Sequence, residues 1–280
     1  MRIEVVCPKC QGELELSAPD DKIHEYYERE KQRGFELEDK ELGIEAARFA
    51  KGFSGEQDAV AWILPKRNLA GAQGIHGLER LYEYAYTFEK LREYGPTGNK
   101  ILEVGGAFSL ITGVFAMSGN ELTCVDVQDW NLTLPHVKIV MCDVLRDKLP
   151  LPFEHFDWIT CLSSIEHFGL GRYDDSPDVD GDLRGMQILR KYLKPSGLMV
   201  LTVPVGEAAV VYPAHRIYGK VRLDKLISGF KVLDKRFYIG DMAIVTFKEC
   251  SEEQAFAVNE GDYAVGCWLL QKGKEPGNII

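Results

Sequence analysis

Short apolar runs alternate with helical patterns over the C-terminal two-thirds of the chain. Five of these runs have the length and composition of buried strands, and turn residues or helical patterns separate them. They are Lys100–Val104, Glu121–Val125, Val137–Met141, Phe156–Cys161 and Leu198–Val203. Such a succession predicts an α/β fold with a doubly wound, mostly parallel sheet.

The tail of the sequence adds two further strand-like runs, Lys231–Tyr238 and Tyr263–Leu270, after a helical segment at Arg222–Ile227. An antiparallel hairpin at one edge of the sheet would accommodate this pair. We therefore expect a seven-stranded sheet with an antiparallel edge.

A small N-terminal extension precedes this sheet. Residues 1–97 are expected to form that mostly helical extension, and residues 98–280 the main domain. Apolar residues recur at helical spacing between Arg80 and Tyr94, and Gly95-Pro96 ends the run, so a helix is expected to pack on the sheet there. The glycine-rich stretch Gly71–Gly77 fits a mobile loop over a site or an ordinary linker equally well.

The N-terminus contains the first half of a zinc-knuckle pattern. Cys7 and Cys10 are spaced to place two thiolates on one ion. A structural zinc site needs four ligands, and no second cysteine pair follows at the required spacing, with His24 the nearest further candidate. We therefore expect a β-turn or the remnant of a site rather than bound zinc.

Composition and charge argue against a nucleic-acid-binding protein and against a membrane protein. The chain has 280 residues, 45% of them hydrophobic, and a formal net charge of −10, which argues against nucleic acid as the main partner. No run approaches the roughly 20 apolar residues of a membrane span, and the first ten residues lack the apolar stretch of a signal peptide. We expect a cytoplasmic protein with no membrane span, whose cysteines are small core residues rather than disulfides.

Residues with suitable chemistry follow the predicted strands, where ligands bind in sheets of this type. Glu103 is placed to face an ammonium group, and Gly105 and Gly106 let the backbone approach a ligand. Asp126 ends the second strand, where a carboxylate can accept from both ribose hydroxyls, and Asp143 follows the third, where it can accept from an adenine amino group. Each signal is weak alone, because a glycine there is often a turn and an aspartate a helix cap, but their order and spacing reinforce one another.

The same residues carry a family resemblance. Ile101–Gly106, Val125-Asp126, Cys142-Asp143-Val144, Phe156-Asp157-Trp158-Ile159 and Leu193-Lys194-Pro195-Ser196-Gly197 resemble, in order, the motifs of class I S-adenosylmethionine-dependent methyltransferases. The resemblance implies a Rossmann-like methyltransferase fold and S-adenosyl-L-methionine as cofactor. It also implies a set of cofactor-binding residues: Glu103, Gly105, Gly106, Asp126, Val127, Asp143, Val144 and Ser163. The family usually has another glycine where this chain has Ala107 or Phe108.

A narrower resemblance covers the region after the fourth strand. The chain is similar to a methyltransferase-like family called DUF268 at Glu166–Asp174, Asp178–Asp182 and His215–Gly219. The resemblance to this family does not by itself imply an activity. In outline that family is similar to methyltransferases of glycan and surface-polysaccharide biosynthesis. This implies O-methylation of a sugar or another small-molecule hydroxyl, with a small-molecule or glycan acceptor.

Two other classes of function compete with this interpretation. A nicotinamide-dependent oxidoreductase or epimerase would use the same sheet, but Ala107 and Leu110 stand where its second and third glycines would fall. A non-catalytic binding module on the same fold is harder to exclude. If the chain is an enzyme acting on a hydroxyl, His167 and His215 are the candidate bases, with His167 directly after the fourth strand.

The last feature is an acidic loop between the fourth strand and the next helix. Asp174, Asp175, Asp178, Asp180 and Asp182 lie close together in sequence, so they must be solvated, paired or bound to a cation. A divalent cation is possible, but we favour a solvated loop with Asp182 as N-cap of a helix beginning near Leu183, and assign no metal ligands.

Overall fold

The computed structural model describes residues 4–6, 13–15, 79–106, 109–128, 137–173, 175, 177–241, 246–259 and 263–273. The chain divides into two compact units, Met1–Phe35 and Glu36–Ile280. In the first unit, strands β1 (Glu4–Val6) and β2 (Glu13–Glu15) pair antiparallel. The domain boundary at residue 98 stays a prediction.

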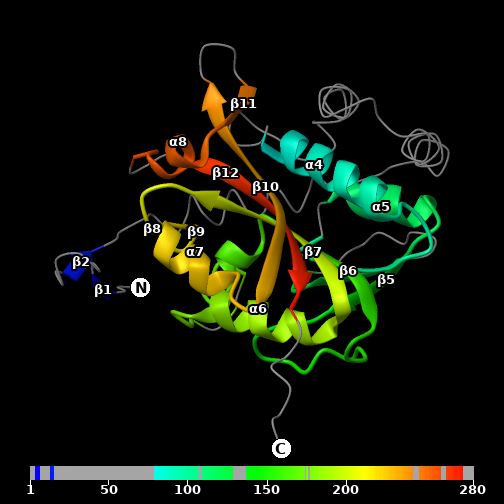
Figure 1. Ribbon diagram of the computed structural model, residues 1–280. Helices are drawn as coiled ribbons and strands as arrows, with labels where there is room; N and C mark the ends of the chain where they lie inside the picture. Colours follow the sequence, from blue (N-terminus) through cyan, green and yellow to red (C-terminus); the bar gives the residue numbers. More distant parts are fainter. Residues whose placement is uncertain are drawn as a thin grey trace, which may run out of the picture. The chain divides into compact units, whose positions relative to one another are not determined.

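An eight-stranded sheet forms the centre of the second unit, in the order β11-β10-β12-β7-β6-β3-β4-β5 (Figure 1). Its strands are β3 (Lys100–Val104), β4 (Glu121–Asp126), β5 (Val137–Met141), β6 (Phe156–Leu162), β7 (Leu193–Val205), β10 (Phe230–Asp241), β11 (Thr246–Cys250) and β12 (Ala264–Lys272). In the part of the sheet ordered β7-β6-β3-β4-β5, neighbouring strands are parallel. Strand β12 lies between β7 and β10 and runs antiparallel to both. The doubly wound fold with an antiparallel edge is confirmed.

Two sequence expectations for the sheet need correction. The sheet has eight strands rather than seven, because β11 pairs antiparallel with the outer side of β10. Strand β7 begins at Leu193 rather than Leu198, since the motif Leu193–Gly197 continues the strand despite its proline and glycine. Both differences lie outside the apolar runs that the periodicity identifies.

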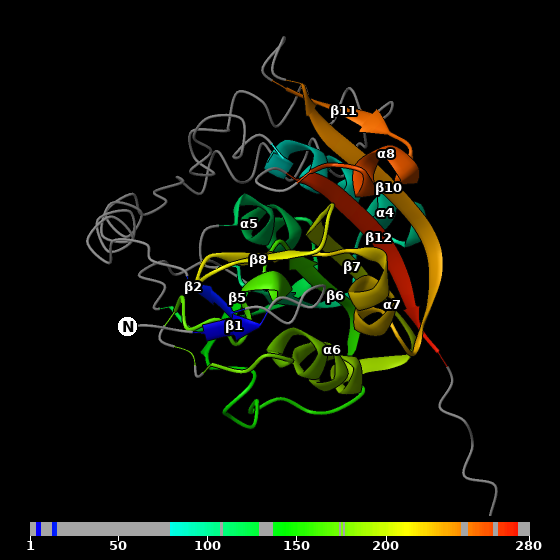
Figure 2. The ribbon, with the colours of Figure 1, turned by 90° about the vertical axis from the view of Figure 1, so that its left-hand side faces the viewer.

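Helices cover both faces of the sheet, as the alternation of strands and helices requires. They are α4 (Glu79–Tyr94), α5 (Leu110–Met117), α6 (Gly181–Tyr192), α7 (Lys220–Leu226) and α8 (Glu252–Phe256). The views in Figures 1 and 2 place α4 and α5 on one side of the sheet and α6 and α7 on the other. Each side has its own apolar cluster, the first with Phe88 and Phe115 and the second with Leu189 and Leu223.

Alternation along β3 directs its side chains to these two layers. Ile101 belongs to the cluster under α4 and α5, whereas Leu102 and Val104 belong to the opposite cluster. Because successive side chains of a strand point to opposite faces, Glu103 lies on the same face as Ile101. The candidate ammonium-binding carboxylate therefore lies under α4 and α5.

A short hairpin and a 3₁₀ turn complete the described part of this unit. Strands β8 (Ala209–Val211) and β9 (His215–Ile217) pair antiparallel, and η3 (Ile165–His167) follows β6. Arg216 of β9 joins this hairpin to η3 and to the residues after it, because its guanidinium donates to the carbonyls of Glu166 and Phe168 over 3.2 and 2.6 Å and to that of Asp178 over 3.2 Å. The hairpin thereby holds the turn that carries His167.

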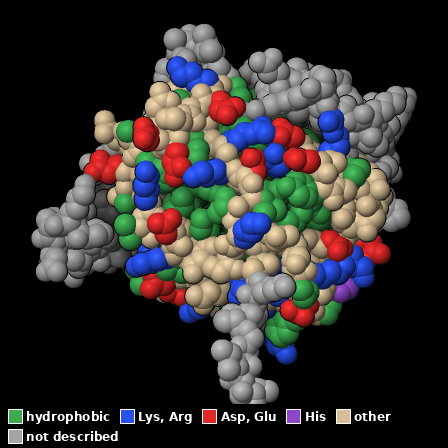
Figure 3. Space-filling model, viewed as in Figure 1, with side chains coloured by type: hydrophobic (Ala, Val, Ile, Leu, Met, Phe, Trp, Pro, Cys, Tyr) green, Lys and Arg blue, Asp and Glu red, His purple; other side chains and the backbone are tan. Residues whose placement is uncertain are grey.

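The surface seen in Figure 3 carries acidic and basic side chains interspersed, with hydrophobic side chains gathered between them. Ion pairs between side chains of opposite charge join α4 to β10. Glu89 pairs with Arg236 over 2.5 Å, and Lys90 pairs with Asp234 over 3.1 Å. Within the described residues, no helix has the length and apolar character needed to cross a membrane.

Candidate functional site

The turn after β3 requires glycine at both predicted positions. Gly105 has a φ of 73°, and a Cβ atom there would overlap with Oγ of Ser164 and lie 2.8 Å from its Cβ atom. A Cβ atom on Gly106 would lie 2.6 Å from Sγ of Cys124 and 2.9 Å from Cδ of Glu103. The turn therefore packs directly against the residues that follow β6 and those within β4. Ala107 and Phe108, where the extra glycine was sought, lie outside the described residues.

Glu103 is buried at the end of β3, with 2% of its surface exposed. Its Oε2 atom accepts a hydrogen bond of 2.5 Å from the hydroxyl of Thr112 on α5. Burial raises the pKa of this carboxyl to about 7, and the nearby carboxylate of Asp126 adds to the increase. The side chain thus fastens α5 to β3, and its negative charge is costly without a cation.

Asp126 and Val127 lie at the end of β4, next to β3 in the sheet. Oδ1 of Asp126 accepts a hydrogen bond of 2.9 Å from the backbone N–H of Gln128, and Val127 is exposed. An aspartate in this position closes a local turn while presenting its carboxylate at the edge where the parallel strands end.

Asp143 and Val144 follow β5, the next strand outward. Oδ1 of Asp143 accepts from the backbone N–H of Leu145 over 2.8 Å, whereas the buried Oδ2 atom has no hydrogen-bond partner. The nearest cation to that oxygen is the guanidinium of Arg146, at 3.5 Å. Val144 is buried in the cluster beneath. A donor group from a ligand would complete the hydrogen bonding of Asp143.

Ser163 has an uncommon backbone conformation at the end of β6, with a φ of 41°. Its N–H donates to Oγ1 of Thr202 over 2.9 Å, and its hydroxyl donates to Oε1 of Glu83. The Ser163 hydroxyl is therefore already engaged, so a ligand would meet this residue mainly through its backbone.

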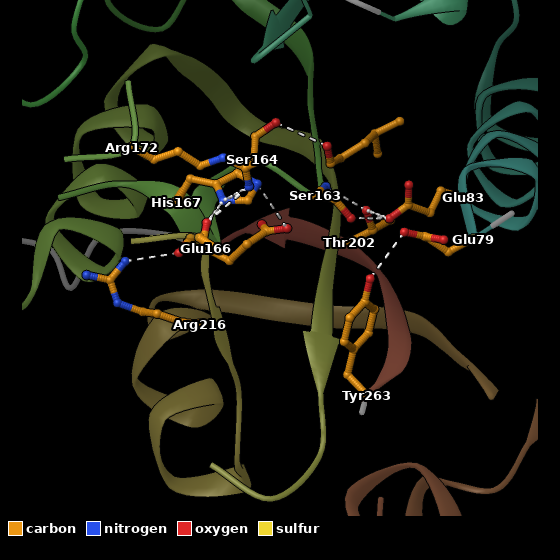
Figure 4. Close-up of polar contacts among 12 residues, drawn as sticks. Glu79, Glu83, Ser163, Ser164, Glu166, His167, Arg172, Thr202, Arg216 and Tyr263 are labelled. Atoms are coloured by element: carbon orange, nitrogen blue, oxygen red, sulfur yellow. Dashed lines mark hydrogen bonds and ion pairs between the residues drawn. The ribbon is translucent and has the colours of Figure 1, made fainter. Parts of the chain in front are cut away.

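Helix α4 supplies polar side chains to this edge of the sheet (Figure 4). Glu83 is fully buried and accepts from the hydroxyl of Thr202 over 2.7 Å and from Arg80 over 3.0 Å. Arg80 also donates to the carbonyl of Leu162 over 2.7 Å. Sequence reasoning missed these residues, because it took from this helix only the spacing of its apolar side chains. The sequence did contain a signal for them, because positions 79, 80 and 83 of this helix carry charged residues and lie between its regularly spaced apolar residues.

His167, a predicted base, lies three residues after Ser164, against which the turn after β3 packs. Its Nδ1 atom lies 2.5 Å from the carbonyl oxygen of Ala214, so Nδ1 carries the proton and Nε2 is the free acceptor. Burial, and then the charge of Arg172, lower the pKa of this ring well below 6.5. The Nε2 atom lies 3.8 Å from Oε1 of Glu166. His167 is thus a neutral imidazole, which a general base requires.

The structure brings His167 and His215 together, with ring centroids 6.4 Å apart. The ring of His215 also contacts that of Tyr263, at 5.5 Å, and the Tyr263 hydroxyl lies 3.3 Å from Oε1 of Glu79. A continuous row of titratable groups therefore links four parts of the fold. It consists of His167 on η3, His215 on β9, Tyr263 just before β12 and Glu79 at the start of α4. Tyr263 and Glu79 were not predicted from the sequence.

Asp182 is not the N-cap of α6, contrary to the sequence expectation. The helix begins at Gly181, Asp180 occupies the N-cap position without a side-chain capping bond, and Asp182 is completely buried. Its carboxylate accepts from Arg222 over 2.5 and 2.9 Å and from the hydroxyl of Tyr218 over 3.0 Å. A distant arginine and tyrosine, invisible to local capping rules, determine its position.

Two other aspartates of the acidic loop are paired rather than merely solvated. Asp178 forms an ion pair with Arg184 over 2.8 Å, and Asp175 accepts from the N–H groups of Gly169 and Tyr173 over 2.7 and 3.1 Å. Among the described residues, no group of three or more histidine, cysteine, aspartate or glutamate side chains is arranged to hold a metal ion.

Several sequence-predicted features lie outside the described residues: Cys7, Cys10, His24, Gly71–Gly77 and Asp174. The five cysteines within the described part are free thiols, and all but Cys250 are buried. Their role as small core residues agrees with the interpretation of the sequence.

Solved structures similar to this chain include three proteins named as methyltransferases. A 1,6-didemethyltoxoflavin-N1-methyltransferase from Burkholderia thailandensis, solved with S-adenosylhomocysteine, is 15% identical, with a TM-score of 0.48, over 66% of this chain and 76% of that one. A methyltransferase from Methanosarcina mazei is 13% identical, with a TM-score of 0.47, over 66% and 98%. The N-methyltransferase NodS from Bradyrhizobium japonicum, also with S-adenosylhomocysteine, is 13% identical, with a TM-score of 0.41, over 66% and 88%.

Among curated proteins, none matches this sequence. A family model described as "Caenorhabditis protein of unknown function, DUF268" matches residues 134–258. The matched segment runs from just before β5 through η3 and β9 to the residues after α8, and so includes Asp143, His167 and His215. The narrower resemblance drawn from the sequence is therefore confirmed over this part of the chain.

Proposed function

We propose that the chain is an S-adenosylmethionine-dependent methyltransferase that methylates a hydroxyl group of a small molecule, with a sugar or glycan as the favoured acceptor. One observation carries this proposal: the glycine turn after β3 packs against Ser164, three residues before a histidine whose Nδ1 atom lies 2.5 Å from the carbonyl oxygen of Ala214, a contact that assigns the acceptor role to Nε2. The site thus combines a ligand-binding turn with a general base.

The residues at the strand ends fit the proposed cofactor. Asp143 has a buried Oδ2 atom without a hydrogen-bond partner, and an adenine amino group is a donor of the kind it lacks. Asp126 would accept from the ribose hydroxyls, and Val127 and Val144 would line the adenosine. Glu103, whose pKa is raised to about 7 by burial, would gain from the charge of the ammonium group, with Gly105, Gly106 and Ser163 contributing backbone.

The chemistry of the site depends on alignment and on one proton transfer. When bound, S-adenosylmethionine supplies a methyl group on a positively charged sulfur. His167 accepts the proton of the acceptor hydroxyl at Nε2, while the carbonyl of Ala214 holds the Nδ1–H and fixes the ring orientation. His215, whose ring contacts that of His167, would position the acceptor or serve as an alternative base.

Glycan acceptors, a cytoplasmic location and the small-molecule partner belong to this proposal. The acceptor class is supported by the sequence resemblance and by the imidazoles of His167 and His215, whose rings contact each other. A binding module without catalysis is the alternative, and it differs in one measurable property, since it would bind cofactor without transferring methyl groups.

The test is transfer of a radiolabelled methyl group from S-adenosylmethionine to a panel of sugars and small alcohols. We expect transfer by the wild-type protein and a loss of about 10²- to 10⁴-fold in His167→Ala, the usual contribution of a general base. His155→Ala is the matched control, because His155 lies before β6, at the opposite end of that strand from His167. Undiminished transfer by His167→Ala would contradict the role of His167. Cofactor binding without transfer to any hydroxyl would favour the binding module.

A further inference from the structure

Glu166 is a buried carboxyl group beside the proposed base. It lies on η3, is 1% exposed, and its Oε1 atom lies 3.8 Å from Nε2 of His167. Figure 4 shows the two side chains next to each other. In the proposed function Nε2 accepts the proton of the acceptor hydroxyl, since the carbonyl of Ala214 holds the Nδ1–H. The carboxyl group of Glu166 therefore faces the reacting end of the ring.

The fold stabilises a negative charge on this carboxyl group poorly. Its Oε2 atom is buried without a hydrogen-bond partner. The guanidinium of Arg216 donates to the backbone carbonyl of Glu166, not to its carboxyl group. Arg80, whose charge also acts on Glu166, donates to Glu83 and to two backbone carbonyls. A buried carboxylate without such donors costs free energy, so Glu166 has a strong tendency to take up a proton.

The surroundings of His167 disfavour a positive charge on its ring. Nη1 of Arg172 lies 3.4 Å from Nδ1 of His167, and it donates over 3.2 Å to the same Ala214 carbonyl that Nδ1 contacts. Burial, and then the charge of Arg172, lower the pKa of the ring well below 6.5. A base with a low pKa holds a proton weakly, so a proton taken up at Nε2 needs a further acceptor.

Glu166 has the proton affinity that such a further acceptor needs. Burial raises its pKa to about 8, with Glu83 adding to the increase and its own backbone N–H, Arg80 and Arg172 opposing it. The carboxyl group therefore binds a proton more tightly than the ring beside it. When the two side chains share one proton, the proton resides on Glu166.

Groups from the other elements packed around the pair also face it. They are Cys161 on β6, Tyr218 before α7, Tyr263 before β12 and His215 on β9. Burial raises the pKa of Cys161, Tyr218 and Tyr263, so these three groups stay protonated when Glu166 ionises. Glu166 is thus the group beside Nε2 that changes its charge near pH 8.

We propose that Glu166 and His167 act as one proton-accepting pair, in which Glu166 receives the proton that His167 removes from the acceptor hydroxyl. The acceptor O–H bond breaks as its oxygen bonds to the methyl carbon and the bond from that carbon to sulfur breaks. The proton goes to Nε2, then to Oε1 of Glu166, which later gives it to water. Because Glu166 acts through His167, it is a positioning residue rather than a catalytic one. This inference rests on the proposed function, which it deepens by naming the group that makes the base effective.

The pair has a definite dependence on pH. It accepts a proton only when Glu166 is ionised, and the ionised fraction rises about tenfold per pH unit below the pKa of about 8. The rate of methyl transfer at saturating S-adenosylmethionine should therefore rise with pH and level off above about pH 8.5. Glu166→Gln removes the titrating group. Its rate should be lower by about tenfold or more at pH 8.5 and should vary little between pH 6.5 and 8.5.

A second measurement needs neither cofactor nor acceptor. The ¹⁵N chemical shift of Nε2 in His167 responds to the charge on Oε1 of Glu166, 3.8 Å away, while the ring itself stays neutral. Nuclear magnetic resonance of protein labelled in its histidine rings should show an inflection of this shift near pH 8 in the wild type and none in Glu166→Gln. An inflection caused by His215 would persist in that variant.

Glu79→Gln is the matched control. Burial raises the pKa of Glu79 to about 8 as well, but its carboxyl group contacts the hydroxyl of Tyr263, over 3.3 Å. This variant should keep both the Nε2 inflection and the rise of the rate with pH.

The outcomes separate the pair from the proposed function. Loss of both features in Glu166→Gln and their retention in Glu79→Gln support the pair. Absence of the Nε2 inflection in the wild type, its persistence in Glu166→Gln, or an unchanged rise of the rate in that variant overturns the inference. Failure of the wild type to transfer a methyl group to any hydroxyl, with the inflection present, would instead overturn the proposed function.

Discussion

The Nδ1 atom of His167 lies 2.5 Å from the carbonyl oxygen of Ala214, which assigns the ring proton to Nδ1 and leaves Nε2 as an acceptor. The two residues lie 47 positions apart, on η3 and just before β9. A backbone carbonyl thus selects the tautomer that a general base needs. The burial that accompanies this contact keeps the ring uncharged.

The first prediction concerns the titration of His167. Burial and the charge of Arg172 lower its pKa well below 6.5, so the ring stays neutral when the pH falls from 8 to 6.5. Nuclear magnetic resonance of protein labelled in its histidine rings measures this directly, with His167→Asn assigning the signal. A titration midpoint at or above 6.5 would show that the ring is not desolvated as described.

A second prediction concerns stability and Glu166. Its pKa is raised to about 8 in the folded protein, so the folded state binds more protons than the unfolded state between pH 4.5 and 8, and stability falls as the pH rises through this range. Glu166→Gln escapes this loss. Relative to the wild type, it should gain up to about 1.4 kcal/mol of unfolding free energy per pH unit. Urea unfolding at pH 5, 6, 7 and 8 measures the gain, and a difference independent of pH would refute it.

The fold was largely predictable because its signals are local. Lys100–Val104 and Val137–Met141 are mainly apolar runs, and the structure reproduces both ranges, the first in the interior of the sheet and the second at its edge. Strand β11 was not predictable in this way, because its sequence at Thr246–Cys250 mixes apolar and charged residues at an outer edge. Edge strands are half exposed, so hydrophobic burial marks them weakly.

The polar half of the site was much less predictable, because long-range contacts create it. Glu83 reaches Thr202 across 119 positions, and Arg222 reaches Asp182 across 40. Capping rules read only the neighbouring residues, so they assigned Asp182 to the start of a helix. Its burial against Arg222 follows from packing between α6 and α7, which no local pattern encodes.

A third prediction separates steric overlap from backbone strain at the glycine turn. Gly105 and Gly98 have nearly equal φ angles, of 73° and 77°, but a Cβ atom would meet Ser164 at Gly105 and nothing within 4 Å at Gly98. Gly98→Ala should cost about 1–2 kcal/mol from the left-handed conformation alone. Gly105→Ala should cost about 1–3 kcal/mol more, because it overpacks the turn. Chemical denaturation of both variants gives the comparison, and equal costs would show that the turn does not pack against Ser164.

A fourth prediction assigns Asp182 a structural role. Its buried carboxylate pairs with Arg222 and Tyr218, so Asp182→Ala should lower the unfolding free energy by about 3–5 kcal/mol, whether or not EDTA is present. Asp180→Ala serves as the control, since its side chain is 62% exposed, and should change stability by less than about 1 kcal/mol. A loss of stability in the wild type on adding EDTA would instead show that the acidic loop holds a cation.

The most direct test of the central claim is thermal unfolding with S-adenosylhomocysteine and, separately, with NADH. A ligand that binds only the folded state adds roughly 2.7 kcal/mol of stability at 100 times its dissociation constant, which raises the melting temperature measurably. The strand-end residues Glu103, Asp126 and Asp143 and the glycine turn after β3 predict such a rise with S-adenosylhomocysteine and none with NADH. A rise with NADH alone would contradict the assignment of this site to S-adenosylmethionine.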